Sequence, residues 1–178
     1  MPNIIRTGGR SGALLSSKSP SPNVDADLNN SYSYLKGRMF EKWIAPAYRR
    51  LIEPCHKAGT LVHMHSDGYI MDIMDELLAC GVDVINPQDL VNGIDTLRDS
   101  LKGRVCIDLD IDRQKIVPYG TRQEIHGLIE EEIRKLGSPQ GGLMLTVGFY
   151  PPTPPENIDA VCEAMEQFRT YWFDGRGE

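Results

Sequence analysis

The chain has 178 residues, of which 40% are hydrophobic and 25% are charged, so its length and composition are those of one soluble globular domain. The net charge of −6 at pH 7 argues against nucleic-acid or anionic-membrane partners, because both need a basic surface. No apolar run approaches the roughly 18 residues that span a bilayer. The four cysteines are widely spaced and no signal segment opens the chain, so we expect no disulfide framework and a cytoplasmic location.

The first part of the chain differs in composition from the rest. Residues 1–37 are rich in Gly, Ser, Pro and Asn and have no sustained hydrophobic period, which predicts an irregular or disordered N-terminal segment before a domain at 38–174. Residues 39–58 show helical spacing, but Pro46 and Pro54 predict a kink or a helix in two pieces.

Strand and helix patterns then alternate along the middle of the chain. A strand is predicted at 61–65, a helix at 69–80, a strand at 82–86, a helix at 90–101 and a strand at 104–111. The first of these helices has one apolar stripe, formed by Ile70, Ile73, Met74, Leu77 and Leu78.

The last third of the chain repeats this alternation. Thr121 and Glu124 have the spacing of a capping box at the start of a helix that ends near Leu136. A strand is predicted at 141–147, and a final helix at 154–172 has Pro155 in its first turn.

Four strands that each precede a helix predict an α/β fold with parallel strands and right-handed crossovers. A closed (β/α)8 barrel needs eight such units and about 250 residues. We therefore expect four βα units that form half of a TIM-type barrel, with a small open sheet as the alternative. Functional groups of parallel α/β folds gather where the strands end.

The first strand ends in a candidate metal site. His63 and His65 are two residues apart, so on a strand they point to the same side, and Asp67 follows closely. Imidazole and carboxylate groups bind divalent metals such as zinc. The alternative is that one histidine is an interior residue and that Asp67 caps the next helix. Asp67 also suits an Asx turn into Gly68.

The third strand ends in three alternating carboxylates. Asp108, Asp110 and Asp112 can share one face, where they would repel one another unless a cation or Arg113 lies between them. We expect one of the three to be functional. The alternative places Asp108 in the interior and the other two on a solvated loop.

Four segments in order resemble the uroporphyrinogen decarboxylase superfamily, which includes the decarboxylase itself and the cobalamin-linked methyltransferases. They are HKAGTLVHMHSDG (56–68), GVDVINPQ (81–88), DIDRQKIVPYGTRQEI (110–125) and GGLMLTVGFYPPTPPENI (141–158). The resemblance covers residues 39–172 and implies the C-terminal half of a (β/α)8 barrel. The motifs are closest to the methyltransferase-like branch.

That branch has a zinc site on an H-x-C-G turn after its fifth strand. His65 matches the histidine, and Asp67 stands in place of the cysteine, so the resemblance implies a His/Asp metal site, with His63 as a further ligand. This donor set favours O- or N-methyl compounds over thiols as the small-molecule substrate. A corrinoid carried by a partner protein is the second expected cofactor.

The same resemblance assigns roles to the other strand ends. It implies substrate contacts from Asn86, Gln88 and Tyr150, and charge or proton transfer by Asp108 and Asp112. Activity would then need the barrel to close, by homodimerisation or with a separate N-terminal half-barrel.

Two alternative functions stay open. A uroporphyrinogen decarboxylase would need arginine-rich walls for its carboxylated substrate. The matched segment offers only a few arginines near the strand ends: Arg98, Arg104, Arg113 and Arg122. The third possibility is a truncated, non-catalytic half-barrel that serves as a binding or assembly module and exposes an apolar seam.

Overall fold

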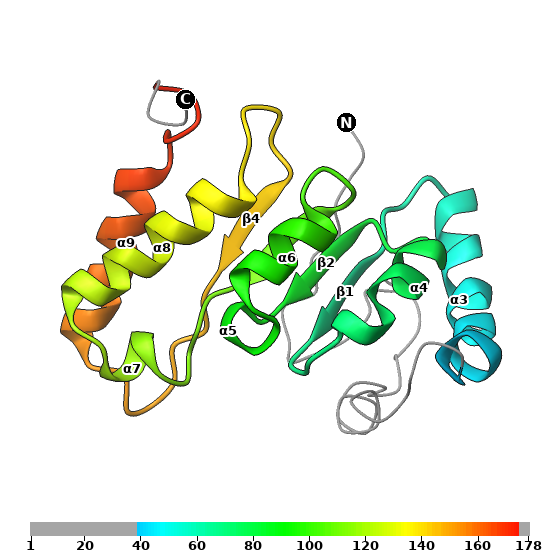
Figure 1. Ribbon diagram of the computed structural model, residues 1–178, viewed down its shortest axis with the longest axis horizontal. Coiled ribbons are helices and arrows are strands. Elements are labelled where there is room, and N and C mark those ends of the chain that lie inside the picture. The colour runs from blue at the N-terminus through cyan, green and yellow to red at the C-terminus, as the bar shows by residue number, and fades with distance from the viewer. Residues whose placement is uncertain (1–38, 175–178) are drawn as a thin grey trace. The chain divides into compact units, whose positions relative to one another are not determined.

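The computed structural model describes residues 39–174, and the predicted irregular segment at 1–37 lies outside this range. The chain divides into two compact units between Pro87 and Gln88, and each is described by itself. Figure 1 labels their helices and strands along the chain.

The first unit begins with two helical pieces, as the prolines predicted. A π-helical turn, η1 (Phe40–Ile44), leads directly into α3 (Ala45–Lys57). Pro46 lies in the first turn of α3, where its missing N–H costs nothing. Pro54 lies inside the same helix without ending it, so the change between the pieces occurs before Pro46 rather than at Pro54.

Two parallel strands form the sheet of this unit. β1 (His63–Ser66) pairs with β2 (Val84–Pro87), with His65 opposite Asn86. Between them lie a 3-10 turn, η2 (Met71–Ile73), and the short helix α4 (Met74–Ala79), so the helix predicted at 69–80 is α-helical only in its second half. The predicted stripe is confirmed: four of its members are buried and Leu78 is half-buried.

The second unit begins with a broken helix. One helix was predicted at 90–101, but the chain forms α5 (Asp89–Asn92) and α6 (Ile94–Leu101). Gly93 separates them at φ 81°, a left-handed conformation that glycine adopts without a steric penalty.

The second unit also contains a parallel strand pair. β3 (Cys106–Asp110) pairs with β4 (Leu143–Thr146), with Asp110 opposite Thr146. Two helices join these strands, the single turn α7 (Ile116–Tyr119) and the longer α8 (Arg122–Leu136). Sequence periodicity missed α7 because four residues are too few to show a helical pattern.

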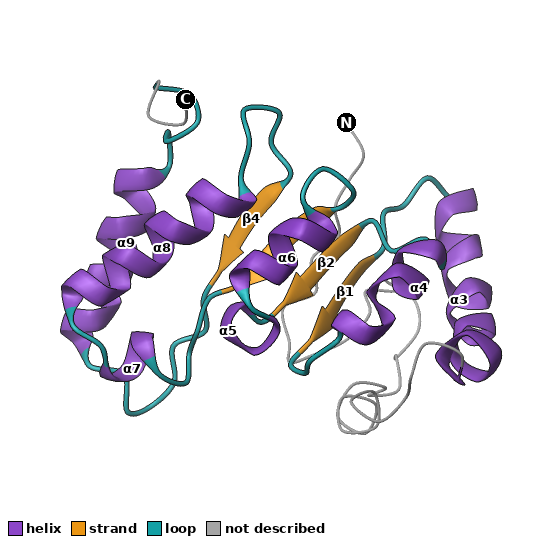
Figure 2. Cartoon of the chain, viewed as in Figure 1, coloured by secondary structure: helices purple, strands orange, loops and turns teal. Residues whose placement is uncertain are grey.

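Helix α8 begins at the predicted capping box. The Thr121 side chain accepts a hydrogen bond from the Glu124 backbone N–H, and the Glu124 carboxylate accepts one from the Thr121 N–H. The last helix, α9 (Pro155–Phe168), has Pro155 at its first position and lies beside α8 (Figure 2). Their facing side chains are buried and apolar, including Ile129 and Ala164.

The fold class is confirmed: four parallel strands, each followed by helix, make four βα units, as expected for part of a TIM-type barrel. Within the described range, no helix is both long and apolar enough to cross a bilayer. All four cysteines lie in this range and are free thiols, as predicted.

Candidate functional site

His65 is held between two oxygen atoms at the carboxyl end of the first strand pair. Its Nδ1 lies 2.5 Å from Asn86 Oδ1, on the neighbouring strand, and its Nε2 lies 3.0 Å from Asp67 Oδ1. The register that places His65 opposite Asn86 produces the first contact. Both ring nitrogens therefore have a partner, which fixes the orientation of the ring.

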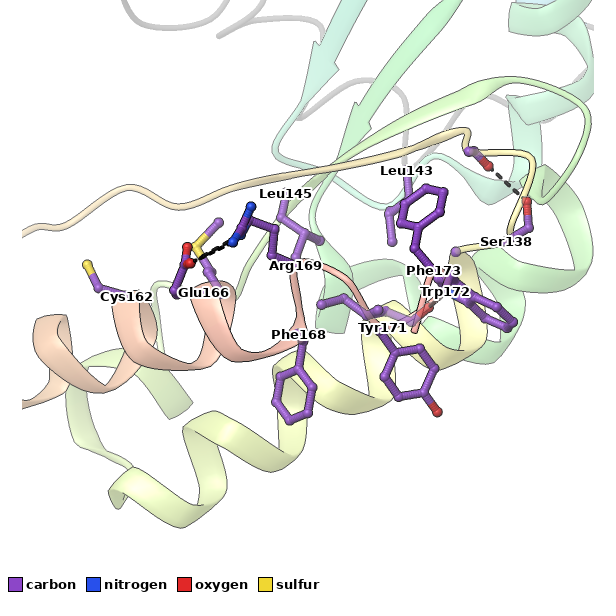
Figure 3. Close-up of a pocket in the computed structure, with 14 residues that line it drawn as sticks. Ser138, Leu143, Leu145, Cys162, Glu166, Phe168, Arg169, Tyr171, Trp172 and Phe173 are labelled. Carbon is purple, nitrogen blue, oxygen red and sulfur yellow. Dashed lines mark hydrogen bonds and ion pairs between the residues drawn. The ribbon is translucent and has the colours of Figure 1, made fainter. Parts of the chain in front are cut away.

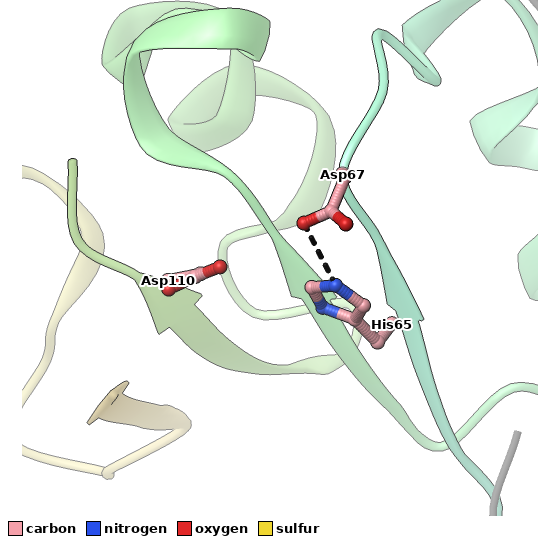
Figure 4. Close-up of side chains that lie close together, drawn as sticks. All are labelled: His65, Asp67 and Asp110. Atoms are coloured by element: carbon pink, nitrogen blue, oxygen red, sulfur yellow. Dashed lines mark hydrogen bonds and ion pairs between the residues drawn. The ribbon is translucent and has the colours of Figure 1, made fainter. Parts of the chain in front are cut away.

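The Ser66 side chain takes part in the turn after β1. The Gly68 N–H donates to Ser66 Oγ at 3.2 Å, so serine closes this turn. The Asp67 carboxylate points to His65, as Figure 4 shows.

The His65–Asp67 geometry fits a metal ion as well as a hydrogen bond. Two ligand atoms about 2.1 Å from one ion at tetrahedral or right angles are about 3.0–3.4 Å apart. The 3.0 Å between Nε2 and Oδ1 falls within this range. A metal-ligating histidine commonly uses its other nitrogen to bind an oxygen that orients it, and Asn86 provides that oxygen here.

His63 lies on the same side of β1 as His65. The burial pattern of this strand alternates, with both histidines half-buried and Met64 and Ser66 buried. This confirms the predicted orientation of the two histidines, while a metal-binding role for either stays a prediction.

The second unit places its own polar side chains at the ends of its strands. Asp108 is buried and accepts a hydrogen bond from Thr146 Oγ1 at 2.7 Å, across the β3–β4 pair. Asp110, labelled in Figure 4 at the end of β3, forms an ion pair with Arg113 at 3.2 Å. The predicted pairing of Arg113 with one of the three carboxylates is thus confirmed.

Tyr150 joins the same group from the loop after β4. The Arg113 guanidinium lies 5.6 Å from the centre of the Tyr150 ring, within the range of a cation–π contact. Asp110, Arg113 and Tyr150 therefore form a row at the carboxyl end of this strand pair. Of these three, only Tyr150 was among the predicted substrate contacts.

Asp112 has a different environment from the other two carboxylates. Its oxygens accept hydrogen bonds from the backbone N–H groups of Gln114, Lys115 and Ile116, at 2.5 to 3.1 Å. Asp112 is buried, and so is Asp110, so the alternative of a solvated loop for these two is wrong. The three bonds make Asp112 the cap of the turn that leads into α7.

Gln88 also belongs to the second unit, directly after β2. It is buried and forms a parallel bridge with Asp110. The predicted site residues are thus divided by the unit boundary: His63, His65, Asp67 and Asn86 lie in the first unit, and Gln88, Asp108, Asp112 and Tyr150 lie in the second.

A pocket of about 650 Å³ lies on the helix side of the second unit (Figure 3). Leu143 and Leu145 of β4 line it together with Phe168 and Trp172. These leucines alternate with Thr146, which contacts Asp108, so the pocket and the polar strand ends lie on opposite faces of β4.

Comparisons with known proteins identify the family of this chain. Residues 26–168 match the family model described as Uroporphyrinogen decarboxylase (URO-D). A uroporphyrinogen decarboxylase of Solibacter usitatus (strain Ellin6076) is 28% identical over 131 residues, which are 73% of this chain and 37% of that relative. The match thus spans little more than a third of the relative. A family model that covers most of the chain, on a fold of four βα units, shows that this protein belongs to the uroporphyrinogen decarboxylase family.

Proposed function

We propose that this chain supplies one part of the active site of a metal-dependent, methyltransferase-like enzyme of the family. The observation that supports this most is the orientation of His65 between Asn86 and Asp67. A divalent cation held by His65 and Asp67, with His63 as a further ligand, would act as a Lewis acid on an oxygen- or nitrogen-bound methyl group. A corrinoid on a partner protein is our proposal for the cofactor that exchanges the methyl group.

The residues of the second unit have complementary roles in this proposal. Asp108 provides negative charge, and Tyr150 and Gln88 contact the small-molecule substrate. The Thr146 hydroxyl donates a hydrogen bond to Asp108 and so orients its carboxylate. The Asp108 carboxylate can therefore hold or accept a proton at a defined place. Asp112 contributes by shaping the loop, since its oxygens already bind the backbone.

A uroporphyrinogen decarboxylase is the second candidate, because the named relative has that activity. The side-chain environment of the arginines favours the first candidate. Arg98 pairs with Asp95 and Asp99, Arg113 with Asp110, and Arg122 with Glu163. The charges of these three arginines are therefore compensated within the chain, and Arg104 donates to the Ser100 carbonyl. A substrate with several carboxylates needs cations directed at it. Formation of coproporphyrinogen by the protein would reverse this preference.

Zinc binding tests the proposed metal site directly. We expect the purified protein to bind one zinc ion, measured by equilibrium dialysis and elemental analysis. His65→Ala and Asp67→Asn should each weaken binding by about 10- to 100-fold or more, because each removes one ligand atom. His56→Asn is the matched control, since His56 pairs with Asp83, which lies directly before the amino end of β2 and not at the carboxyl ends of the strands. Equal zinc binding by wild type and His65→Ala would overturn the proposal.

We further propose that a second copy of the chain pairs with the outer edge of β4. Ile107 N donates to Gly142 O and Ile111 N to Thr146 O, so the even-numbered residues of β4 bond to β3. In a parallel ladder the backbone groups of Leu143 and Leu145 then face the other edge. The apolar pocket beside this edge supplies surface that a neighbouring βα unit would cover.

The solution mass at several concentrations tests this pairing. Light scattering should give a discrete dimer of this 19.9 kDa chain. Leu145 lines the pocket, and Leu145→Lys should shift the equilibrium to monomer, because the substitution places a charge in the covered surface. A monomer at every concentration would exclude the homodimer and favour a separate half-barrel as the partner.

A further inference from the structure

Glu132 is an acidic residue in the core of the second unit. It lies on α8 and its side chain is 0% exposed. It occupies the face of the helix that also contains Ile125, Leu128, Ile129, Ile133 and Leu136, all of them buried. An ionised carboxylate in such a place would need a cation or several hydrogen-bond donors.

The structure provides neither for Glu132. Among the described residues, no donor makes a hydrogen bond to either of its carboxyl oxygens. The group beside it is another acid, the Asp89 carboxyl at the start of α5. Two carboxyl groups can share a hydrogen bond only when one of them carries a proton.

The surroundings decide which acid holds the proton. Asp89 accepts hydrogen bonds from the backbone N–H groups of Leu90, at 2.5 Å, and Asp112, at 2.9 Å. Burial raises the pKa of Asp89 too, but these bonds act against that rise by stabilising its negative charge, whereas Glu132 has no such donor. Burial, and after it the neighbouring Asp89, raises the pKa of Glu132 well above its ordinary value of 4.5.

The groups around Glu132 add only negative charge. Asp89 faces it from α5, Asp112 acts on it from the loop after β3, and Glu131 acts from its own helix. The nearest cations with a printed partner are bound elsewhere: Lys102, directly after α6, donates to the Lys135 carbonyl, and Lys135 of α8 pairs with Asp95 and Glu131. Glu163 of α9 pairs with Arg122, and α7 has no charged side chain.

We infer that Glu132 is a protonated carboxylic acid that donates a hydrogen bond to Asp89, and that this bond positions the loop after β3. The connection continues outward from the core. Asp89 holds the backbone of Asp112, and Asp112 caps the turn into α7. Glu132 is thus a positioning residue for the segment that follows Asp110, independent of which reaction the family site performs.

The pH dependence of unfolding tests this inference on the full chain. A pKa raised on folding gives stability that is fully present below the unfolded pKa of about 4.5 and is lost as the pH rises through the folded pKa. Glu132→Gln keeps a donor for Asp89 but has no proton to lose. We expect the ratio of the unfolding constants, wild type over Glu132→Gln, to grow about tenfold per pH unit above pH 4.5 until the folded pKa is reached.

Three further measurements separate positioning from simple burial. Glu130→Gln, on the exposed side of α8, should leave the pH dependence unchanged. Glu132→Leu fills the core without donating to Asp89, so the Asp112 N–H should exchange with solvent faster than in Glu132→Gln.

At pH 7 the infrared carbonyl band of a protonated carboxylic acid should be present in wild type and absent in Glu132→Gln. A ratio of unfolding constants that does not change with pH would overturn the inference. So would the absence of the infrared carbonyl band in wild type, a result that needs no variant.

Discussion

Replacement of Asp112 by alanine is expected to lower the free energy of unfolding by about 3 kcal/mol, because it removes the acceptor of three backbone N–H groups. The affected groups begin the turn into α7, and they would lose a charged partner in a partly buried loop. For a chain of this size, the loss corresponds to a fall in the midpoint of thermal unfolding of about 6–12 °C.

Thermal and urea unfolding of matched variants measure this effect. Asp112→Asn keeps one oxygen acceptor and should lose about half as much stability. Asp99→Ala is the surface control, since Asp99 only pairs with Arg98 on an exposed face of α6, and it should change stability by less than about 1 kcal/mol. If Asp112→Ala unfolds like wild type while substrate turnover is lost, the carboxylate is catalytic rather than a cap.

Replacement of Asn157 by alanine is expected to cost about 3 kcal/mol, because one buried amide satisfies two backbone carbonyls. Asn157 lies in the first turn of α9, and its Nδ2 donates to Val117 O at 2.8 Å and to Gly120 O at 3.0 Å. It thereby joins α9 to the chain that follows α7. Without it, both carbonyls lose their partner in a buried place.

Asn157→Asp provides the sharpest comparison for this contact. The carboxylate has the same shape but offers only acceptors to two carbonyl oxygens, so this variant should be at least as unstable as Asn157→Ala. Asp159→Ala, on the exposed side of the same helix, is the control and should stay within about 0.5 kcal/mol of wild type. Urea unfolding that ranks Asn157→Asp close to wild type would contradict a donor role for the amide.

The candidate site could be predicted in part, because strand alternation is visible in sequence. The two-residue spacing of His63 and His65 correctly places both on one side of β1. The same spacing in Asp108, Asp110 and Asp112 predicted that the three carboxylates share one face, and the structure gives each a different partner. Thr146, Arg113 and the backbone after Asp112 decide those partners, and they become neighbours only through strand pairing and loop closure.

Glu132 shows what helical periodicity could have revealed. It occurs at the spacing of the apolar stripe on α8, between Ile129 and Ile133, so a buried acid was visible in the pattern. Its partner Asp89 is 43 residues away in the sequence, and only packing brings the two carboxyl groups together.

The sequence by itself determined the order of the βα units, the capping box of α8, the apolar stripe of α4 and the family, because local periodicity and short motifs decide these features. Only the tertiary structure decided that Gly93 divides a helix, that Asp67 contacts His65, and that Asp112 caps a turn. The physical reason is that a polar side chain bonds to whichever donor or acceptor the fold places beside it, and backbone groups compete for that role wherever a strand ends.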